Sequence, residues 1–241
     1  MQKVFTANYK VNMYDVDAPG RVKMSRVMEH LLVAANDHSD ELGWSHEYLE
    51  KEHNICMVLL LAHIEIKGKI AINDNITLKT WAEPRVYPLI VRHFVAYNGE
   101  NVVYEAIVHC GLMDLTERTM VNGNNYGLTL PEVEGEVPET TVKIERIPRK
   151  YLLSEEHIMI KDFLTGYSDL DYNGHVNSAR YIDFLEDTVN GTFKKIDIQY
   201  TNEIKPLSPV KVEVNGNPDE EEKIAVGKCD GKIQFVCKYL M

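Results

Sequence analysis

The chain has 241 residues, of which 44% are hydrophobic and 26% are charged, as in an ordinary globular protein. Its formal net charge of −11 disfavours non-specific binding to nucleic acid or to anionic membranes. No apolar run approaches the roughly 20 residues that cross a bilayer, and residues 1–17 lack the basic and then apolar order of a signal peptide. We therefore expect a cytoplasmic protein without membrane insertion.

No Cys-x-x-Cys pair occurs among the four cysteines, which are Cys56, Cys110, Cys229 and Cys237. Three of them fall in apolar, strand-like stretches, where buried free thiols are more common than disulfides or zinc ligands. We therefore expect free thiols, and neither a metal nor another cofactor.

The chain contains an internal repeat. Residues 13–34 resemble residues 167–188 at an offset of 154, and residues 63–79 resemble residues 197–213 at an offset of 134. The difference, 154 − 134 = 20, is the number of extra residues that the first copy carries, and they fall near residues 41–54. Two copies of one structural unit explain this pattern most economically.

In chain order, each copy predicts a strand, a turn with two aspartates, a helix and then several strands. The first copy predicts a helix over residues 25–37 and strands at 75–84, 89–97 and 101–115, with an Asn98-Gly99 hairpin between the last two strands. The second copy predicts a helix over residues 178–190, capped by Asn177, and strands at 194–204, 209–215, 223–229 and 232–240, with Asp230-Gly231 at the final hairpin.

One long helix followed by consecutive antiparallel strands is an α+β pattern, in which a sheet wraps around the helix. We expect this arrangement to be built twice. Residues 1–130 would form the first module and residues 151–241 the second. Residues 131–150 are rich in Pro, Glu and Lys, as expected of a surface linker between the modules.

A polar loop stands out in the second copy, Asp169-Leu-Asp-Tyr-Asn-Gly-His-Val-Asn177, and its opening is similar to that of a calcium-binding EF-hand loop. Such a loop needs a bidentate Glu at its twelfth position, but Arg180 stands there. The preceding residues also indicate a strand, whereas an EF-hand needs a helix there. The sequence therefore argues against calcium.

A plain turn that caps the following helix is a second interpretation of this loop. It leaves the cluster of Asp171, Asn173 and His175 without a role. In the first copy Pro19 and Arg21 replace Asn173 and His175, so that copy keeps the turn and lacks the reactive side chains. The contrast between the copies favours a catalytic loop in the second.

Residues 169–187, together with the segment Ile-Asp-Ile-Gln-Tyr-Thr-Asn-Glu-Ile at 196–204, resemble the acyl-acyl carrier protein thioesterases of plants and bacteria. Members of that family carry two hotdog modules in tandem, with an Asp-x-Asn-x-His-x-Asn motif in the second. The resemblance covers nearly the whole chain. It implies a tandem hotdog fold and a role in fatty acid biosynthesis, namely hydrolysis of acyl-acyl carrier protein to free fatty acid.

The resemblance also implies catalytic roles for Asp171, Asn173 and His175 in the loop and for Glu203 on the strand after the helix. Plant members place a Cys directly after that Glu, whereas Ile204 follows Glu203 here. This departure removes a thiol from the site and favours hydrolysis by an activated water.

For such a hydrolysis we expect His175 and Glu203 to form the base that takes a proton from water, and which of the two abstracts it stays open. Asn173 would orient the water or the carbonyl, and Asp171 would hold the side chains of Asn173 and His175. The backbone N–H groups of residues 175–177 would bind the developing oxyanion at the start of the helix.

The first module, which lacks the reactive loop, is the expected place for the acyl chain. Candidate lining residues there are Trp44, Met57, Leu59 and Leu61, although ordinary core packing explains each of them equally well. Acyl carrier protein is acidic, so a partner of charge −11 needs a local basic patch for docking. Candidate members of such a patch are Arg146, Arg149, Lys150, Lys194 and Lys195.

Several alternatives stay open at this level. The nearest one is a hotdog thioesterase that acts on acyl-coenzyme A. A hotdog dehydratase is disfavoured because its His-Phe-Pro type of loop is missing. A non-catalytic acyl-binding module is the alternative from a different class. Chain-length preference is open, and so is the choice between monomer and homodimer.

Overall fold

The computed structural model describes residues 1–144, 147, 157–215 and 221–241. Contacts between residues divide the chain into two compact units. Unit 1 comprises Met1–Asn12 and His30–Lys143, and unit 2 comprises Met13–Glu29 and Ile144–Met241. The expected module boundaries follow the sequence repeat, whereas this division follows contacts, and they differ chiefly in residues 13–29.

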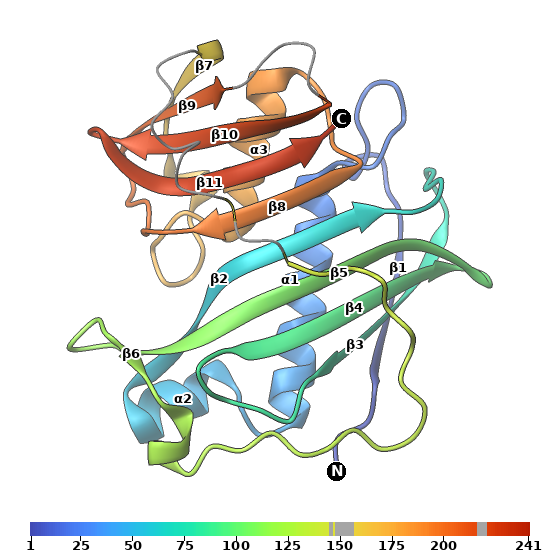
Figure 1. The fold of residues 1–241 in the computed structure, drawn as a ribbon, viewed down its shortest axis with the longest axis vertical. Coiled ribbons are helices and arrows are strands. Elements are labelled where there is room, and N and C mark those ends of the chain that lie inside the picture. The colour runs from blue at the N-terminus through green and yellow to red at the C-terminus, as the bar shows by residue number, and fades with distance from the viewer. Residues whose placement is uncertain (145–146, 148–156, 216–220) are drawn as a thin grey trace. The chain divides into compact units, whose positions relative to one another are not determined.

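Unit 1 consists of one antiparallel sheet, helices and short connecting elements (Figure 1). Its elements are β1 (Phe5–Lys10), the part of α1 (Met24–Glu41) from His30 onward, α2 (His46–His53), β2 (Ile55–Ile66), β3 (Asn75–Ala82), β4 (Ile90–Asn98), β5 (Asn101–Asp114), β6 (Met120–Val121) and the 3₁₀ turn η1 (Gly123–Tyr126). The strand order within the unit is β1-β3-β4-β5-β2, and β6 pairs with β5.

Unit 2 contains the second helix and sheet (Figure 1). Its elements are the first turns of α1, β7 (His157–Leu164), the 3₁₀ turn η3 (Tyr167–Asp169), α3 (Ser178–Val189), β8 (Lys195–Tyr200), β9 (Pro209–Asn215), β10 (Glu222–Cys229) and β11 (Lys232–Leu240). The strand order within the unit is β7-β9-β10-β11-β8, all antiparallel.

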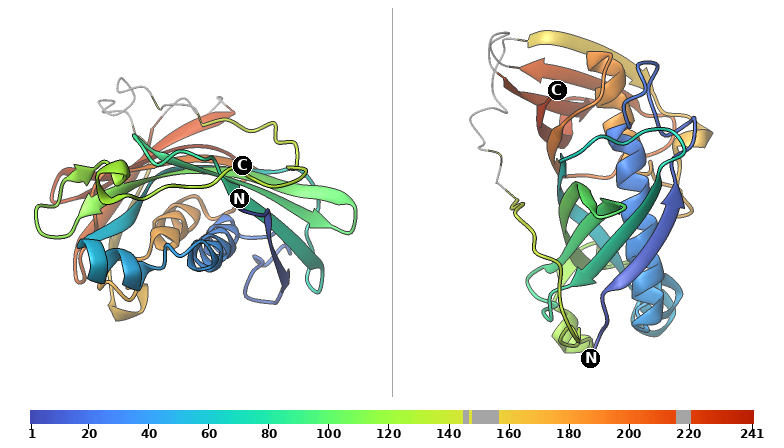
Figure 2. Two further views of the ribbon diagram at one scale, coloured as in Figure 1. Left: turned by 90° about the horizontal axis from the view of Figure 1, so that it is seen from below. Right: turned by 90° about the vertical axis from the view of Figure 1, so that its right-hand side faces the viewer.

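The strands of the two units are arranged in the same order. β7, β9, β10, β11 and β8 take the places of β1, β3, β4, β5 and β2. In both units the long helix lies against one face of its own sheet (Figure 2). The α+β organisation predicted from the repeat is therefore confirmed, and the additional residues of the first copy form α2.

The hairpins that the sequence predicts are also present. Asn98 pairs with Asn101 across the β4–β5 turn, where Gly99 has a φ of 62°. Cys229 pairs with Lys232 across the β10–β11 turn, where Asp230 and Gly231 have φ values of 49° and 77°. Positive φ at both central residues is the geometry that favours Asp-Gly in such turns.

Helix α3 follows its sequence signals closely. The Asn177 side chain accepts a hydrogen bond from the Ala179 N–H at 2.9 Å, and Asn190 ends the helix with a φ of 52°. One face of α3 is buried through Ala179, Ile182 and Leu185. Helix α1 runs to Glu41, four residues beyond the predicted end at 37. No helix among the described residues is long and apolar enough to cross a membrane.

Candidate active site

The polar loop of the second copy folds as a tight turn. The Asp171 N–H donates to the His175 carbonyl at 2.8 Å, and the Gly174 N–H donates to the Asp171 carbonyl at 3.1 Å. Leu170 and Val176 form an antiparallel bridge on either side. Gly174 has a φ of 75°, which explains why glycine occupies the turn. The chain therefore reverses its direction at Asn173-Gly174.

Asp171 stabilises this turn through backbone groups. Its Oδ1 accepts hydrogen bonds from the Asn173 N–H at 2.9 Å and from the His175 N–H at 3.3 Å. The expectation that this carboxylate holds the side chains of Asn173 and His175 is therefore wrong. An Asp side chain commonly accepts a hydrogen bond from the backbone N–H two residues later, which forms an Asx turn. The Asp171 carboxylate makes this local bond here. Asn173 itself is exposed at the tip of the turn.

His175 and Glu203 lie side by side. The His175 Nε2 is 3.4 Å from the Glu203 Oε2, and the two side chains are 31% and 37% exposed. The turn is joined to the Glu203 segment because the Val176 N–H donates to the Ile204 carbonyl at 3.0 Å. An imidazole and a carboxylate therefore meet at a solvent-accessible position, where a water molecule can reach both.

Glu203 is held in a loop. The strand β8 ends at Tyr200, so the expectation that Glu203 lies on a strand is wrong. Instead, the backbone N–H groups of Thr201 and Asn202 both donate to the Gln234 carbonyl, at 2.8 and 3.1 Å. The side-chain amide of Asn202 donates to the Ile233 carbonyl at 2.7 Å. These contacts with β11 end the regular strand and fix the start of the loop.

The predicted oxyanion donors are engaged inside the protein. The His175 N–H donates to Asp171 Oδ1, the Val176 N–H to the Ile204 carbonyl and the Asn177 N–H to the Asp169 carbonyl. The expectation that these three groups bind the oxyanion is therefore wrong. They hold the turn in place, because a buried N–H needs an acceptor and the folded chain supplies one.

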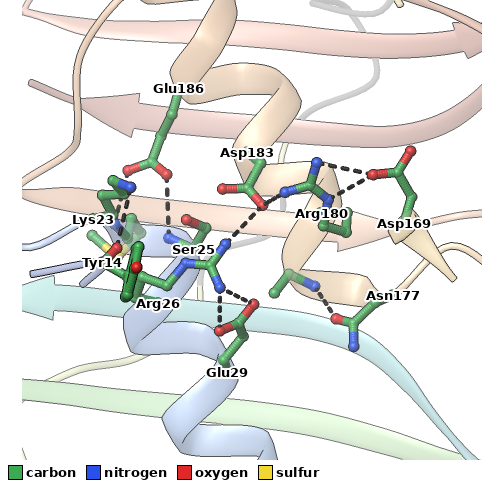
Figure 3. Close-up of polar contacts among 12 residues, drawn as sticks. Tyr14, Lys23, Ser25, Arg26, Glu29, Asp169, Asn177, Arg180, Asp183 and Glu186 are labelled. Carbon is green, nitrogen blue, oxygen red and sulfur yellow. Dashed lines mark hydrogen bonds and ion pairs between the residues drawn. The ribbon is translucent and has the colours of Figure 1, made fainter. Parts of the chain in front are cut away.

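A chain of charged residues anchors the start of the loop (Figure 3). Asp169 is 7% exposed, and its Oδ1 accepts hydrogen bonds from the Arg180 Nε and ion-pairs with the Arg180 Nη2, each at 2.9 Å. Its Oδ2 accepts a hydrogen bond from the Gly166 N–H at 2.7 Å. Arg180 also pairs with Asp183 on the next turn of α3. The Arg that stands at the twelfth position of the loop thus occupies the first carboxylate that calcium would use.

The first copy forms the same turn with different side chains. The Asp17 N–H donates to the Arg21 carbonyl at 2.8 Å, and the Arg21 N–H donates to Asp17 Oδ1 at 2.8 Å. Gly20 has a φ of 85°. The Arg21 side chain folds back onto Asp17, with 2.7 Å between Nη2 and Oδ2. The turn is thus common to both copies, and the imidazole belongs to the second copy alone.

The candidate acyl-binding residues lie in unit 1. Trp44 is 7% exposed and belongs to an apolar cluster with Leu49 and Ile55, against which Met57 packs. Leu59 is half-buried on β2. Their role in substrate binding stays a prediction.

The candidate docking patch is described only in part. Lys194 is exposed, and Lys195 forms an ion pair with Glu222 at 3.1 Å. The other candidates, Arg146, Arg149 and Lys150, lie outside the described residues. The docking patch stays a prediction as well.

All four cysteines are free. Cys237 is fully buried, and burial raises the pKa of its thiol well above the usual range. Burial, with Asp230 nearby, also raises the pKa of Cys229. Neither thiol is prepared to act as a nucleophile at neutral pH.

Tyr181 contacts the candidate site but was not among the residues predicted from the sequence. The hydroxyl of Tyr181 on α3 contacts the backbone on both sides of Glu203. The repeat carries a signal for it, because Val27 stands at the aligned position of the first copy, where Lys69 replaces Glu203. Only the second copy combines a tyrosine with a glutamate.

The chain is similar to known proteins along most of its length. Residues 2–123 match the model of the acyl-ACP thioesterase N-terminal domain, and residues 153–234 match that of the C-terminal domain. Among curated proteins, a chloroplastic dodecanoyl-[acyl-carrier-protein] hydrolase of Cinnamomum camphora is 23% identical over 208 residues, or 77% of this chain. The chain spans about half, 51%, of the length of that relative.

Solved structures share the fold. An acyl-ACP thioesterase from Bacteroides thetaiotaomicron has a TM-score of 0.78 at 22% identity, with 98% of this chain and 97% of that chain covered. The 12:0-ACP thioesterase from Umbellularia californica has a TM-score of 0.79 at 16% identity, with 98% and 96% covered. These matches confirm the tandem hotdog fold. The two domain models, which cover both halves of the chain, show that this chain belongs to the acyl-ACP thioesterase family.

Proposed function

We propose that this protein hydrolyses the thioester of fatty acyl-acyl carrier protein and releases the free fatty acid. The observation that carries the proposal is the His175–Glu203 pair, with 3.4 Å between Nε2 and Oε2, where His175 lies in a turn whose exposed tip holds Asn173. The aligned positions of the first copy hold Arg21 and Lys69, which supply neither an imidazole nor a carboxylate. Membership of the acyl-ACP thioesterase family and its dodecanoyl-ACP hydrolase relative support the same reaction.

In the proposed mechanism a water molecule between the His175–Glu203 pair and the thioester attacks the carbonyl carbon. The pair takes one proton from the water as the new carbon–oxygen bond forms. The carbon–sulfur bond then breaks, and the same proton is returned to the leaving thiolate. General acid–base assistance of this kind contributes about 10²- to 10⁴-fold to the rate.

The remaining loop residues support that reaction. Asn173 has an amide that can donate to the carbonyl or accept from the water, and its exposed position leaves it accessible to substrate. Asp171 acts indirectly, because it holds the backbone of the turn that presents Asn173 and His175. Ile204 directly after Glu203 leaves no thiol there, which supports attack by water rather than by cysteine.

We propose acyl carrier protein as the carrier, and a cytoplasmic role in fatty acid biosynthesis as a monomer or homodimer. The carrier is acidic and this chain has a net charge of −11, so productive docking requires a local basic surface. Lys194 is exposed and available for such a surface. Attraction between exposed charges is screened by salt.

The proposal is tested by measuring thiol release from acyl chains of increasing length, each attached either to acyl carrier protein or to coenzyme A. We expect faster turnover of the carrier-protein thioesters and a loss of that preference as the salt concentration rises. Faster turnover of the coenzyme A thioesters with a flat salt response would assign the protein to acyl-coenzyme A instead. Binding of both thioesters without thiol release would contradict hydrolysis altogether.

A further inference from the structure

Glu203 lies in a loop, so the strands of the sheet do not set the direction of its side chain. Its position depends on how the two peptide groups that flank it are held. The first is the Asn202–Glu203 peptide, which contributes the Asn202 carbonyl. The second is the Glu203–Ile204 peptide, which contributes the Ile204 N–H.

Both peptide groups contact one hydroxyl. The Ile204 N–H donates to the Tyr181 Oη at 2.9 Å, and the Tyr181 hydroxyl donates to the Asn202 carbonyl at 3.4 Å. A phenolic hydroxyl can accept and donate at the same time, so a single group serves both contacts. Burial raises the pKa of Tyr181 above its usual range, so the proton needed for the second bond is retained.

The tyrosine itself is rigidly placed. It is 4% exposed on α3, and its ring packs edge-on against Tyr200 and Phe235, with 5.3 Å between ring centroids in each case. The same helix begins directly after the turn that carries His175. Helix α3 is therefore a common support for both members of the pair.

We propose that Tyr181 is a positioning residue that sets the distance between Glu203 and His175. The expected loss of activity rests on the proposed function. The expected change in the distance between Glu203 and His175 rests on the geometry alone. The first copy fits it, because Val27 at the aligned position has no hydroxyl and Lys69 replaces the glutamate that would need support.

The test is Tyr181→Phe in the full-length protein, which removes one hydroxyl and keeps the packed ring. We expect kcat to fall about 10- to 100-fold with KM little changed, because small misplacements of catalytic groups cost that much. In a Glu203→Gln background the same substitution should have little further effect, since residues that act through one another are not additive. The matched control is Tyr104→Phe, which removes another buried hydroxyl, hydrogen-bonded to Tyr9 at 3.1 Å.

A second readout does not require turnover. The ¹⁵N signals of the His175 ring report its contact with Glu203 at a fixed pH. They should shift toward those of Glu203→Gln in Tyr181→Phe, and stay at the wild-type values in Tyr104→Phe. If the wild-type protein hydrolyses no thioester, the proposed function fails, and these signals still decide the role of Tyr181.

Two results would overturn the inference. The first is a Tyr181→Phe variant with wild-type kcat and wild-type His175 signals. The second is an equal fractional loss of kcat in the wild-type and Glu203→Gln backgrounds, which would mean that Tyr181 acts independently of Glu203.

Discussion

Replacing Arg180 by methionine should destabilise the protein through the carboxylate that it leaves behind. Arg180 makes two contacts of 2.9 Å with Asp169 Oδ1, and the Asp169 side chain, taken without its backbone, is only 9% exposed. Charge-assisted hydrogen bonds of this kind contribute about 1.5–3 kcal/mol each when buried, but the Arg180 side chain is 32% exposed. Allowing for solvent, and for the Gly166 N–H that still donates to Asp169, we expect a loss of about 2–3 kcal/mol in the free energy of unfolding.

Urea unfolding at pH 7 measures this loss, and the chain offers a matched control. Arg26 stands at the aligned position of the first copy and pairs with Glu29 and Asp183, whose side chains are 36% and 13% exposed. Arg26→Met should therefore cost less than Arg180→Met. Combining Arg180→Met with Asp169→Asn should recover part of the loss, because a buried amide is less costly than an unpaired carboxylate.

The contact between Arg180 and Asp169 should also affect the proposed activity. The Asp169 carbonyl accepts the Asn177 N–H at the end of the turn that carries His175, so release of Asp169 should loosen this turn and lower kcat. An Arg180→Met variant as stable as the wild type, or no more affected than Arg26→Met, would show that the contact between Arg180 and Asp169 does not stabilise the protein.

Acid should destabilise the protein through His38, because burial and the neighbouring Arg92, whose Nη1 is 2.8 Å from Nδ1, lower its pKa from 6.5 to about 4. The stabilising contribution is present above pH 6.5 and is lost as the pH falls through about 4. It amounts to about 3 kcal/mol in all, and His38→Gln should flatten the fall in urea midpoint between pH 7 and pH 4.5. Cys229→Ser should keep wild-type turnover and iodoacetamide should not inhibit, because the proposed site uses no thiol; loss of turnover in either experiment would implicate a cysteine.

The elements that could be predicted from the sequence are those with local signals. The Asn98-Gly99 and Asp230-Gly231 hairpins need positive φ values that these residues adopt readily, and the structure has them. The start of α3 follows from Asn177, whose side chain caps the helix within two residues. The repeat predicts the fold of each unit, because the two copies must bury their helix faces in the same way.

The details that could not be predicted depend on contacts between distant residues. The sequence predicts a strand that continues through Glu203, but the Asn202 side chain donates to the Ile233 carbonyl on β11 and the strand ends earlier. The position of Val176 at the start of the helix predicts that its N–H binds an oxyanion, but this N–H donates to the Ile204 carbonyl instead. Neither partner is visible from residue spacing, since both pairings are set by the folded sheet.

The helix α1 shows the same limit. Its apolar stripe of Val27, Leu31 and Ala34 predicts the helix and its buried face correctly. Its N-terminus, however, is capped by the Glu186 carboxylate, which accepts the Met24 N–H at 2.8 Å. The two residues are 162 positions apart in the chain, so no local pattern identifies this cap.

We propose that the second copy hydrolyses acyl thioesters through His175 and Glu203. The most direct test is single-turnover thiol release from acyl-acyl carrier protein by the wild type, His175→Ala and Glu203→Gln, beside Lys69→Gln at the aligned position of the first copy. We expect His175→Ala and Glu203→Gln each to lose about 10²- to 10⁴-fold in rate while remaining folded, and Lys69→Gln to keep the wild-type rate. Turnover at the wild-type rate by folded Glu203→Gln or His175→Ala would contradict the proposal.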